Sequence, residues 1–188
     1  PLLPNESCNL GSLDVAKFLE TNNEGIVKLN WNRLGKSVRL ATRMLDNVID
    51  ANKYAVDAIE DMTHATRKLG LGVMGFADML VQLGIPYDTD KAVELGRKLM
   101  AFIRDNADAE SLALAEERGP FPAWHNSHAA NQGEKPYRNA CRLTVAPTGT
   151  ISMIAGASSG IEPIFALAFR KQNILEGKTL YYVDKNFE

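Results

Sequence analysis

Apolar residues recur at three- and four-residue steps in three stretches of the chain. This spacing places them on one face of an amphipathic helix, and it predicts helices over residues 31–52, 57–67 and 88–117. Asp57, with Glu60 three residues later, is the predicted N-cap of the second helix. Three long helices with one apolar face each require a sheet or another helix to cover that face.

Shorter apolar and β-branched runs, which lack helical spacing, predict buried strands. These runs occupy residues 69–74, 143–146, 164–169 and 180–183. The remaining elements are expected to be short helices at 13–20, 76–83 and 151–155, and polar loops at 21–28 and 121–135. Strands that alternate with amphipathic helices indicate an α/β fold with parallel strands.

One glycine-rich stretch matches a nucleotide-binding fingerprint in letters only. Gly70, Gly72 and Gly75 have the G-x-G-x-x-G spacing, but a helix and the basic pair at 67–68 precede them, and apolar residues alternate with them. The dinucleotide fingerprint follows a strand and opens a helix. We therefore interpret these residues as a strand with small side chains that permit close approach.

A second glycine turn has the features of a phosphate site. The turn at 147–150 follows a predicted strand and leads into a helix, whose first N–H groups and positive dipole end suit a phosphate. Gly149 permits close approach, and Thr148, Thr150 and Ser152 add hydroxyl donors. The turn is not a Walker A loop, because the spacing and the lysine of that motif are missing. A helix that is simply capped by Thr and Ser explains the pattern equally well.

The composition narrows the class of protein. The chain has 188 residues, one domain's worth, and its net charge of −2 argues against a nucleic-acid-binding protein. No apolar run approaches the roughly 20 residues of a membrane span. Cys8 and Cys141 form no CxxC motif, so we expect neither a disulfide framework nor a metal site. We expect a cytoplasmic protein, and because the chain starts at Pro1 without Met, a fragment of a longer one.

Two pairs of residues have spacings that a metal site can use. Asp46 and Asp50 share a helix face, and His125 and His128 lie three residues apart. No further ligand accompanies either pair, so we expect the aspartates to be solvated or hydrogen-bonded and the histidines to lie in a surface insertion.

Other polar residues have structural interpretations. Arg39 and Arg43 fall away from the apolar face of their helix and are interpreted as solvated. Glu162 stands in a Ser/Gly turn, where an acidic side chain usually accepts hydrogen bonds from backbone N–H groups. Tyr181 and Tyr182 are expected to pack.

Several motifs, in order along the chain, resemble the large, catalytic subunit of ribonucleotide reductases. The resemblance is greatest to the adenosylcobalamin-dependent (class II) branch and covers nearly the whole chain. The motifs are P-L-L-P-N-E-S-C-N-L-G-S at 1–12, R-K-L-G-L-G-V-M-G-F-A-D-M-L at 67–80, A-E-E-R-G-P-F-P at 115–122, R-N-A at 138–140, A-P-T-G-T-I-S-M-I-A-G at 146–156 and S-S-G-I-E-P at 158–163.

The resemblance implies a fold and a place in a longer protein. Residues 1–188 are then a single partial domain, the second half of the ten-stranded α/β barrel, in a fragment of a longer catalytic chain. The N-terminal half, with the effector site and the dimer helices, would lie elsewhere.

The resemblance also implies a reaction, the reduction of ribonucleotides, expected to be diphosphates, to deoxyribonucleotides by a thiyl-radical mechanism. Adenosylcobalamin would generate the radical. Cys8 would be one of two redox thiols that close into a disulfide, with its partner outside this chain. The backbone of Leu10 would face the substrate. The ribose and phosphate would contact Pro147, Thr148, Gly149, Thr150 and Ile151.

Other parts of the family's active site are not in this sequence. The radical cysteine belongs to an Asn-x-Cys-x-Glu segment, which is expected just upstream of Pro1. Asn5 and Glu6 do not have the spacing to Cys8 that this segment requires. Cys141 is interpreted as a packed strand residue, with a Cys8–Cys141 disulfide as a minor alternative.

The implied partners are a ribonucleotide, the N-terminal part of the same enzyme, a thioredoxin-like reductant and a second copy in a homodimer. The setting would be deoxyribonucleotide biosynthesis for DNA replication. One alternative is a class I large subunit, which uses a separate radical-generating subunit. Another is a non-catalytic phosphate-binding fragment that acts only with a partner chain. Alone, the fragment is expected to be inactive.

Overall fold

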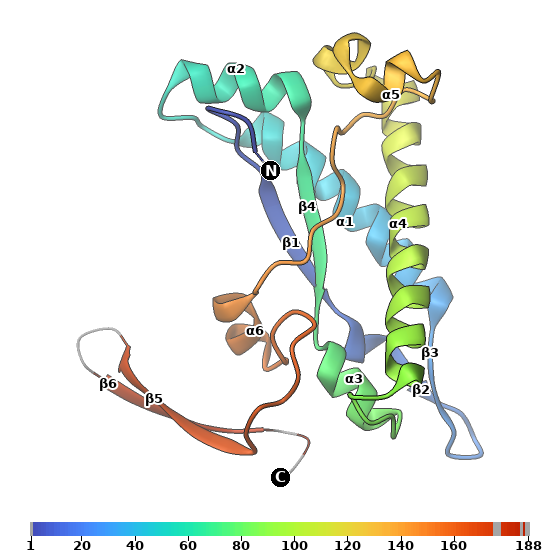
Figure 1. Ribbon diagram of the computed structural model, residues 1–188, viewed down its shortest axis with the longest axis vertical. Coiled ribbons are helices and arrows are strands. Elements are labelled where there is room, and N and C mark those ends of the chain that lie inside the picture. The colour runs from blue at the N-terminus through green and yellow to red at the C-terminus, as the bar shows by residue number, and fades with distance from the viewer. Residues whose placement is uncertain (1, 175–177, 185, 187–188) are drawn as a thin grey trace.

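Two parallel strands form the centre of the molecule. The computed structural model describes residues 2–174, 178–184 and 186 (Figure 1). Strand β1 (Asn9–Asp14) lies beside β4 (Leu69–Met74), with Asn9 opposite Leu69 and Asp14 opposite Met74. All six residues of β4 are buried, which explains why its sequence is an uninterrupted apolar and glycine run rather than an alternation.

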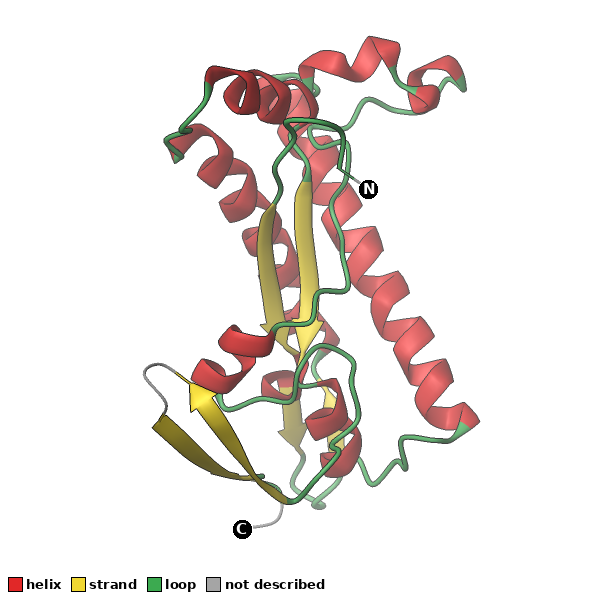
Figure 2. Cartoon of the chain, turned by 60° about the vertical axis from the view of Figure 1, so that its left-hand side comes forward, coloured by secondary structure: helices red, strands yellow, loops and turns green. Residues whose placement is uncertain are grey.

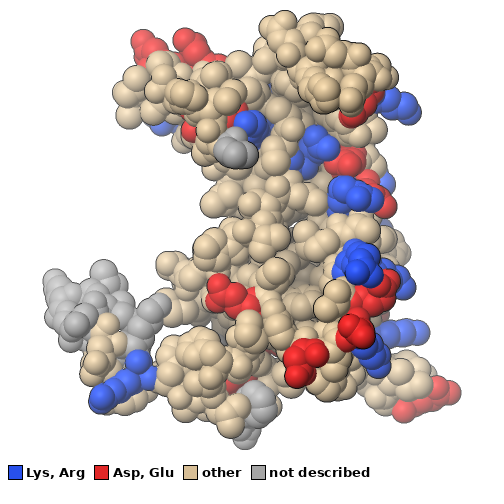
Figure 3. All heavy atoms as spheres, in the orientation of Figure 1, with Lys and Arg blue, Asp and Glu red and all other residues tan. Residues whose placement is uncertain are grey.

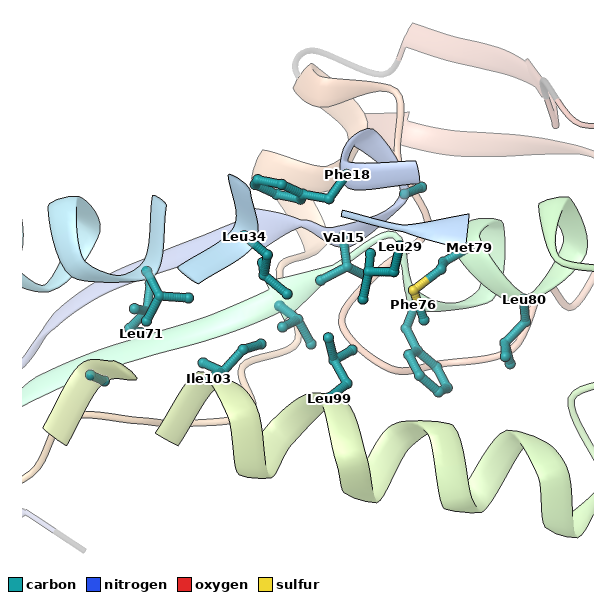
Figure 4. Close-up of a cluster of buried hydrophobic side chains, with 14 of the residues drawn as sticks. Val15, Phe18, Leu29, Leu34, Leu71, Phe76, Met79, Leu80, Leu99 and Ile103 are labelled. Atoms are coloured by element: carbon teal, nitrogen blue, oxygen red, sulfur yellow. The ribbon is translucent and has the colours of Figure 1, made fainter. Parts of the chain in front are cut away.

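Two long helices pack on this strand pair (Figures 1 and 2). They are α1 (Trp31–Ala51) and α4 (Asp90–Arg118), close to the helices that the apolar spacing predicts. Thr89 caps α4 by accepting a hydrogen bond from the N–H of Ala92. Figure 4 shows the core that results, where α1, α4, β4 and the residues after β1 meet through Val15, Leu34, Leu71, Leu99 and Ile103.

The elements between β1 and α1 differ from the prediction. The 3-10 helix η1 (Val15–Phe18) is shorter than the helix expected at 13–20, and the loop expected at 21–28 contains an antiparallel hairpin of β2 (Leu19–Thr21) and β3 (Val27–Leu29). The Asn22 side chain accepts hydrogen bonds from the N–H groups of Glu24 and Ile26, which closes the turn.

Helix α2 (Asp57–Thr66) starts at a different residue from the predicted one. Val56 is the N-cap and makes no side-chain bond, whereas Asp57 is the first helical residue. The carboxylates of Asp57 and Glu60 still favour the positive end of the helix dipole. The helix ends at Arg67, which has the left-handed conformation with φ 46° and ψ 46°. Helix α3 (Phe76–Gln82) follows β4, as predicted.

The stretch at 121–135 is not simply a polar loop. It contains a 3-10 helix η2 (Pro122–Asn126) and a short helix α5 (His128–Asn131). Phe121 and Trp124 are buried and stack edge to face, so these aromatic side chains anchor the segment.

The prediction of a strand at 143–146 is wrong. The segment runs along the free side of β4 but forms a single parallel bridge, between Leu143 and Leu71. The N–H of Thr144 donates to the carbonyl of Leu71, after which the chain leaves the sheet with Val145 exposed. Pro147 has no N–H with which to continue a ladder. Helix α6 (Gly149–Ala155) then begins two residues earlier than expected.

The C-terminal strands form an antiparallel arm that projects from the rest of the molecule (Figure 1). They are β5 (Ala168–Ile174) and β6 (Lys178–Val183), which overlap the predicted strands. Tyr181 is 80% exposed, so the prediction that it packs is wrong; the side chain of Tyr182 lies outside the described residues.

The fold class is confirmed only at a coarse level. The structure mixes helices with strands, and one strand pair is parallel. The other two sheets are antiparallel hairpins, and the described residues do not close into a barrel, so ten strands are not confirmed.

Candidate active site

Cys8 stands at the start of β1 and lines a cavity of about 520 Å³. The residue precedes Asn9, the first residue of the parallel ladder, and therefore lies next to Lys68 at the start of β4. The other residues that line the cavity are Leu2, Leu10, Leu69, Cys141, Leu143 and Thr144. The predicted redox thiol thus faces a space that a small ligand can enter.

The glycines of β4 make room for this site. A Cβ atom at Gly70 would lie 3.3 Å from the sulfur of Cys8 and 3.0 Å from Cγ2 of Thr144, and it would overlap Cδ2 of Leu10. At Gly72 a Cβ atom would lie 2.6 Å from the carbonyl oxygen of Thr144, which is closer than real contacts permit. The letters that resemble a nucleotide fingerprint are therefore a strand that allows close packing, as the sequence predicts.

The surroundings of Cys8 keep its thiol protonated. Burial raises the pKa of the Cys8 thiol, and the nearby Cys141 and the negative charge of Glu6 raise it further. The ammonium group of Lys68 opposes them by favouring the thiolate, but the pKa remains above its usual value.

Cys141 is not the packed strand residue that the sequence suggests. It lies outside any regular strand and lines the same cavity as Cys8. Both cysteines are free. The N–H of Leu69 donates to the carbonyl of Cys141, so Cys8 and Cys141 flank β4 on opposite sides. Two strand spacings put their Cα atoms roughly 9–10 Å apart, beyond the ~7 Å that a disulfide spans. This argues against a Cys8–Cys141 disulfide.

The predicted phosphate loop is exposed at the start of α6. Ser152 makes the first backward bond of the helix, from its N–H to the carbonyl of Thr148 (2.9 Å). The N–H groups of Gly149, Thr150 and Ile151 precede it and have no partner within the helix. These three residues and Pro147 are exposed. The loop therefore presents the backbone donors of a helix start, which suit an anion.

Hydrogen bonds to the following turn hold this loop in shape. Thr148 is buried and has the left-handed conformation, with φ 54°, and its hydroxyl accepts a bond from the N–H of Gly160 (2.7 Å). The hydroxyls of Ser152 and Ser159 are 3.0 Å apart. The backbone N–H of Ser158 donates in turn to Asp78 of α3.

Glu162 does not have the role that its turn suggests. Its side chain is exposed, and within the described part of the chain its carboxylate accepts no backbone N–H bond. The hydroxyl of Thr148 and the carboxylate of Asp78 make the bonds to this turn instead.

The structure places the predicted site residues in two groups. Cys8 and Leu10 lie together, although Leu10 is 63% exposed and covers Gly70 only in part. The residues 147–151 do not line this cavity. Thr144 does line the cavity, and the five residue steps from Thr144 to Gly149 can span at most about 18 Å.

A buried charge network supports the start of β4, and sequence reasoning identified it only in part. The carboxylate of Asp46 is fully buried and accepts bonds from Nε of Arg67 (3.0 Å) and Nδ2 of Asn139 (2.8 Å). Arg67 also forms two bonds to Asp50, at 2.7 and 2.8 Å. The expectation that Asp46 and Asp50 are solvated or hydrogen-bonded is therefore confirmed, since both accept hydrogen bonds. Asn139 stands in the R-N-A motif and Arg67 begins the motif at 67–80, but no helical or strand periodicity connects either residue to Asp46.

The arginines of α1 are also paired rather than simply solvated. Arg43 forms ion pairs of 2.8 Å with Glu110 and Glu117 of α4, and Nε of Arg39 donates to Asn106. On the face shown in Figure 3, positive and negative side chains are intermixed along the side formed by α4.

The described residues offer neither a metal site nor a membrane span. Within them, no group of three or more His, Cys, Asp and Glu side chains is placed to hold a metal ion. No helix in the described ranges is both long and apolar enough to cross a membrane.

Comparisons with known proteins give one family. The model of the ribonucleotide reductase barrel domain matches residues 1–188. A vitamin B12-dependent ribonucleoside-diphosphate reductase of Thermoplasma acidophilum is 54% identical over 100% of this chain and 24% of its own length. One of the same name from Mycobacterium tuberculosis is 47% identical over 100% of this chain and 26% of its own. A ribonucleoside-diphosphate reductase subunit alpha of Chlamydia pneumoniae is 30% identical over 89% of this chain and 19% of its own length. The chain spans about a quarter of the length of the Thermoplasma and Mycobacterium relatives.

Proposed function

The chain belongs to the ribonucleotide reductase barrel-domain family, and from this premise we propose that it is part of an adenosylcobalamin-dependent ribonucleoside-diphosphate reductase. Its own contribution is one redox thiol, Cys8, and the substrate-phosphate loop. The observation that carries the proposal is the position of Cys8 on a cavity next to β4, where glycines leave space for it.

The role of Cys8 is to supply reducing electrons. Loss of the ribose 2′-OH as water leaves a carbon that must gain two electrons and a proton. Two thiols supply them and become one disulfide, so Cys8 needs a partner, which we place outside this chain. The protonated state of Cys8 suits this step, because a thiol delivers a hydrogen together with its electron. A dithiol reductant of the thioredoxin type would then restore both thiols.

The role of residues 147–151 is to hold the phosphate end of the substrate. The N–H groups of Gly149, Thr150 and Ile151 point out of the start of α6, and the bond from Gly160 to Thr148 keeps the turn in shape. We propose that the ribose lies at the Cys8 cavity, next to Leu10, and that the phosphates reach α6. The N-terminal part of the same enzyme would close the site, and the complete enzyme would be a homodimer.

The cofactor proposal rests on the names of the relatives. The cavity at Cys8, at about 520 Å³, has a size typical of sites for drug-sized molecules, of roughly 300–1,000 Å³. A corrinoid nucleotide is much larger, so the described residues around Cys8 do not form its site. When bound to the complete enzyme it would supply the radical chemistry. A class I large subunit is the second candidate, favoured by the relatives named subunit alpha, and dependence of the complete enzyme on added adenosylcobalamin separates the two.

Substitution of Cys8 tests the proposal directly. In the complete enzyme, Cys8→Ser is expected to abolish multiple turnovers with a dithiol reductant, because the disulfide can no longer form. The measurement is deoxynucleotide formed per enzyme over time. Cys141→Ser is the matched control, since it removes the other thiol of the same cavity and is expected to retain turnover. Full turnover by Cys8→Ser would contradict the redox role.

A further inference from the structure

Two residues before Cys8, a carboxylate is buried with an ammonium group as its partner. The side chain of Glu6 has no exposed surface, and its Oε2 lies 2.7 Å from Nζ of Lys68. The same oxygen accepts the N–H of Leu3 (2.7 Å), and Oε1 accepts the hydroxyl of Thr66 (2.5 Å). Burial alone would raise the pKa of Glu6, but these bonds and the charge of Lys68 together lower it, so the carboxylate is ionised.

The same contacts fix the backbone that carries Cys8. Ser7 donates its N–H to Oγ1 of Thr63 (3.3 Å), and the two hydroxyls are 2.8 Å apart. Glu6 and Ser7 are therefore attached to the last turns of α2 and to Lys68, while Asn9 enters the ladder with β4. Cys8 is the residue between these two attachments, so its position depends on both.

Lys68 acts on the thiol through its charge, in addition to its ion pair with the carboxylate. It lines the Cys8 cavity and stands next to Cys8 at the start of the two strands. The titratable groups that act on the thiol are Glu6 from its own segment, Lys68 from the start of β4 and Cys141 from the segment beside β4. Glu6 and Cys141 favour the thiol, and Lys68 favours the thiolate.

We propose that the Glu6–Lys68 ion pair is a positioning device for Cys8, which holds the Cys8 segment in place and sets two opposite charges beside it. The cavity then contains a protonated thiol despite the ammonium group on its wall. This inference rests on the proposed redox function only for its biological meaning, because the reactivity of Cys8 can be measured without turnover.

Charge variants of the complete enzyme test this inference. The probe is iodoacetamide, whose carbon is attacked by the Cys8 thiolate with loss of iodide, and the Cys8 peptide is quantified by mass spectrometry from pH 6 to 10. Glu6→Gln removes the negative charge and keeps an acceptor, so the pH midpoint is expected to fall and the rate at neutral pH to rise several-fold. Lys68→Met is expected to move the midpoint upward, because Glu6 remains ionised at these pH values.

The double variant separates charge from structure. If the two charges cancel, Glu6→Gln with Lys68→Met is expected to return the midpoint close to that of the unmodified protein. Lys68→Arg, which keeps the charge, is expected to stay there as well. Glu94→Gln, which changes an exposed ion pair with Arg97, is the matched surface control.

Two results would overturn the inference. One is faster alkylation in both single variants with no shift in the midpoint, which would mean that the charges of the pair do not act on the thiol. The other is no change in any folded variant, as judged by circular dichroism. Neither depends on deoxynucleotide formation, so failure here is distinguishable from failure of the redox role, which the Cys8→Ser turnover assay reports.

Discussion

The two halves of the candidate site are built in different ways. Cys8 lies in the packed half, where β1, β4, α1 and α4 meet and where contacts join residues about 60 apart in sequence, such as Glu6 and Lys68. The proposed phosphate loop lies in an exposed half, where the bond that shapes the loop directly joins residues only 12 apart, Thr148 and Gly160. The position of the thiol therefore depends on many distant contacts, whereas the loop depends mainly on the turn that follows it, which a bond from Ser158 to Asp78 attaches to α3.

This difference has a chemical consequence. A redox thiol must be kept at a defined position and protonation state, which requires a partly buried setting with fixed charges. An anion site requires exposed N–H groups and little burial. Substitutions in the packed half are expected to cost more stability than substitutions in the loop.

The largest expected effect is at Asp46. Asp46→Ala removes the carboxylate that accepts hydrogen bonds from Arg67 and Asn139 and leaves these buried donors without an acceptor. This change is expected to lower the free energy of unfolding by about 3–5 kcal/mol. The measurement is the free energy of unfolding from denaturant titration. Asp105→Ala, at an exposed pair with Arg104, is the control and is expected to cause no measurable loss. An equal loss in both variants would show that the network does not support the packed half.

Two glycine substitutions are expected to change the free energy of unfolding by smaller amounts and in opposite directions. Gly70→Ala forces a methyl group against Leu10 and Thr144, so it is expected to cost about 1–3 kcal/mol and to alter the alkylation rate of Cys8. Gly149→Ala meets nothing within 4 Å in the first turn of α6, so it is expected to stabilise by a few tenths of a kcal/mol. Thermal unfolding of both variants checks the comparison, which fails if Gly149→Ala is the more destabilising.

The smallest expected loss of stability is in the turn that shapes the loop. Thr148→Ala removes the acceptor of the Gly160 N–H, so a loss of about 1 kcal/mol and a higher KM for the nucleotide are expected. Thr148→Ser keeps the hydroxyl and is expected to retain both properties. Denaturant titration and initial-rate kinetics on the complete enzyme measure them. A KM that is unchanged in Thr148→Ala would separate the turn from substrate binding.

Some of this molecule was determined by the sequence alone. The spacing of apolar residues predicted α1 and α4 within a few residues, because helical periodicity is a local property. The interleaved apolar and glycine residues at 69–74 predicted a strand rather than a dinucleotide loop, because the composition of a short run is also a local property. The motifs around Cys8 and residues 147–151 indicated the family before any contact was known.

The tertiary structure decided what depends on distant residues. The strand expected at 143–146 has the right composition, but a ladder needs a partner with a matching register, and the segment makes one bridge before it leaves the sheet. The tertiary structure also places Cys141 on the wall of the Cys8 cavity, because the segment of Cys141 lies on the other side of β4 from Cys8. The ion pair of Glu6 with Lys68, and the burial of Asp46 between Arg67 and Asn139, join segments that no local pattern connects. Only the packing of these segments brings such charges together and removes them from water.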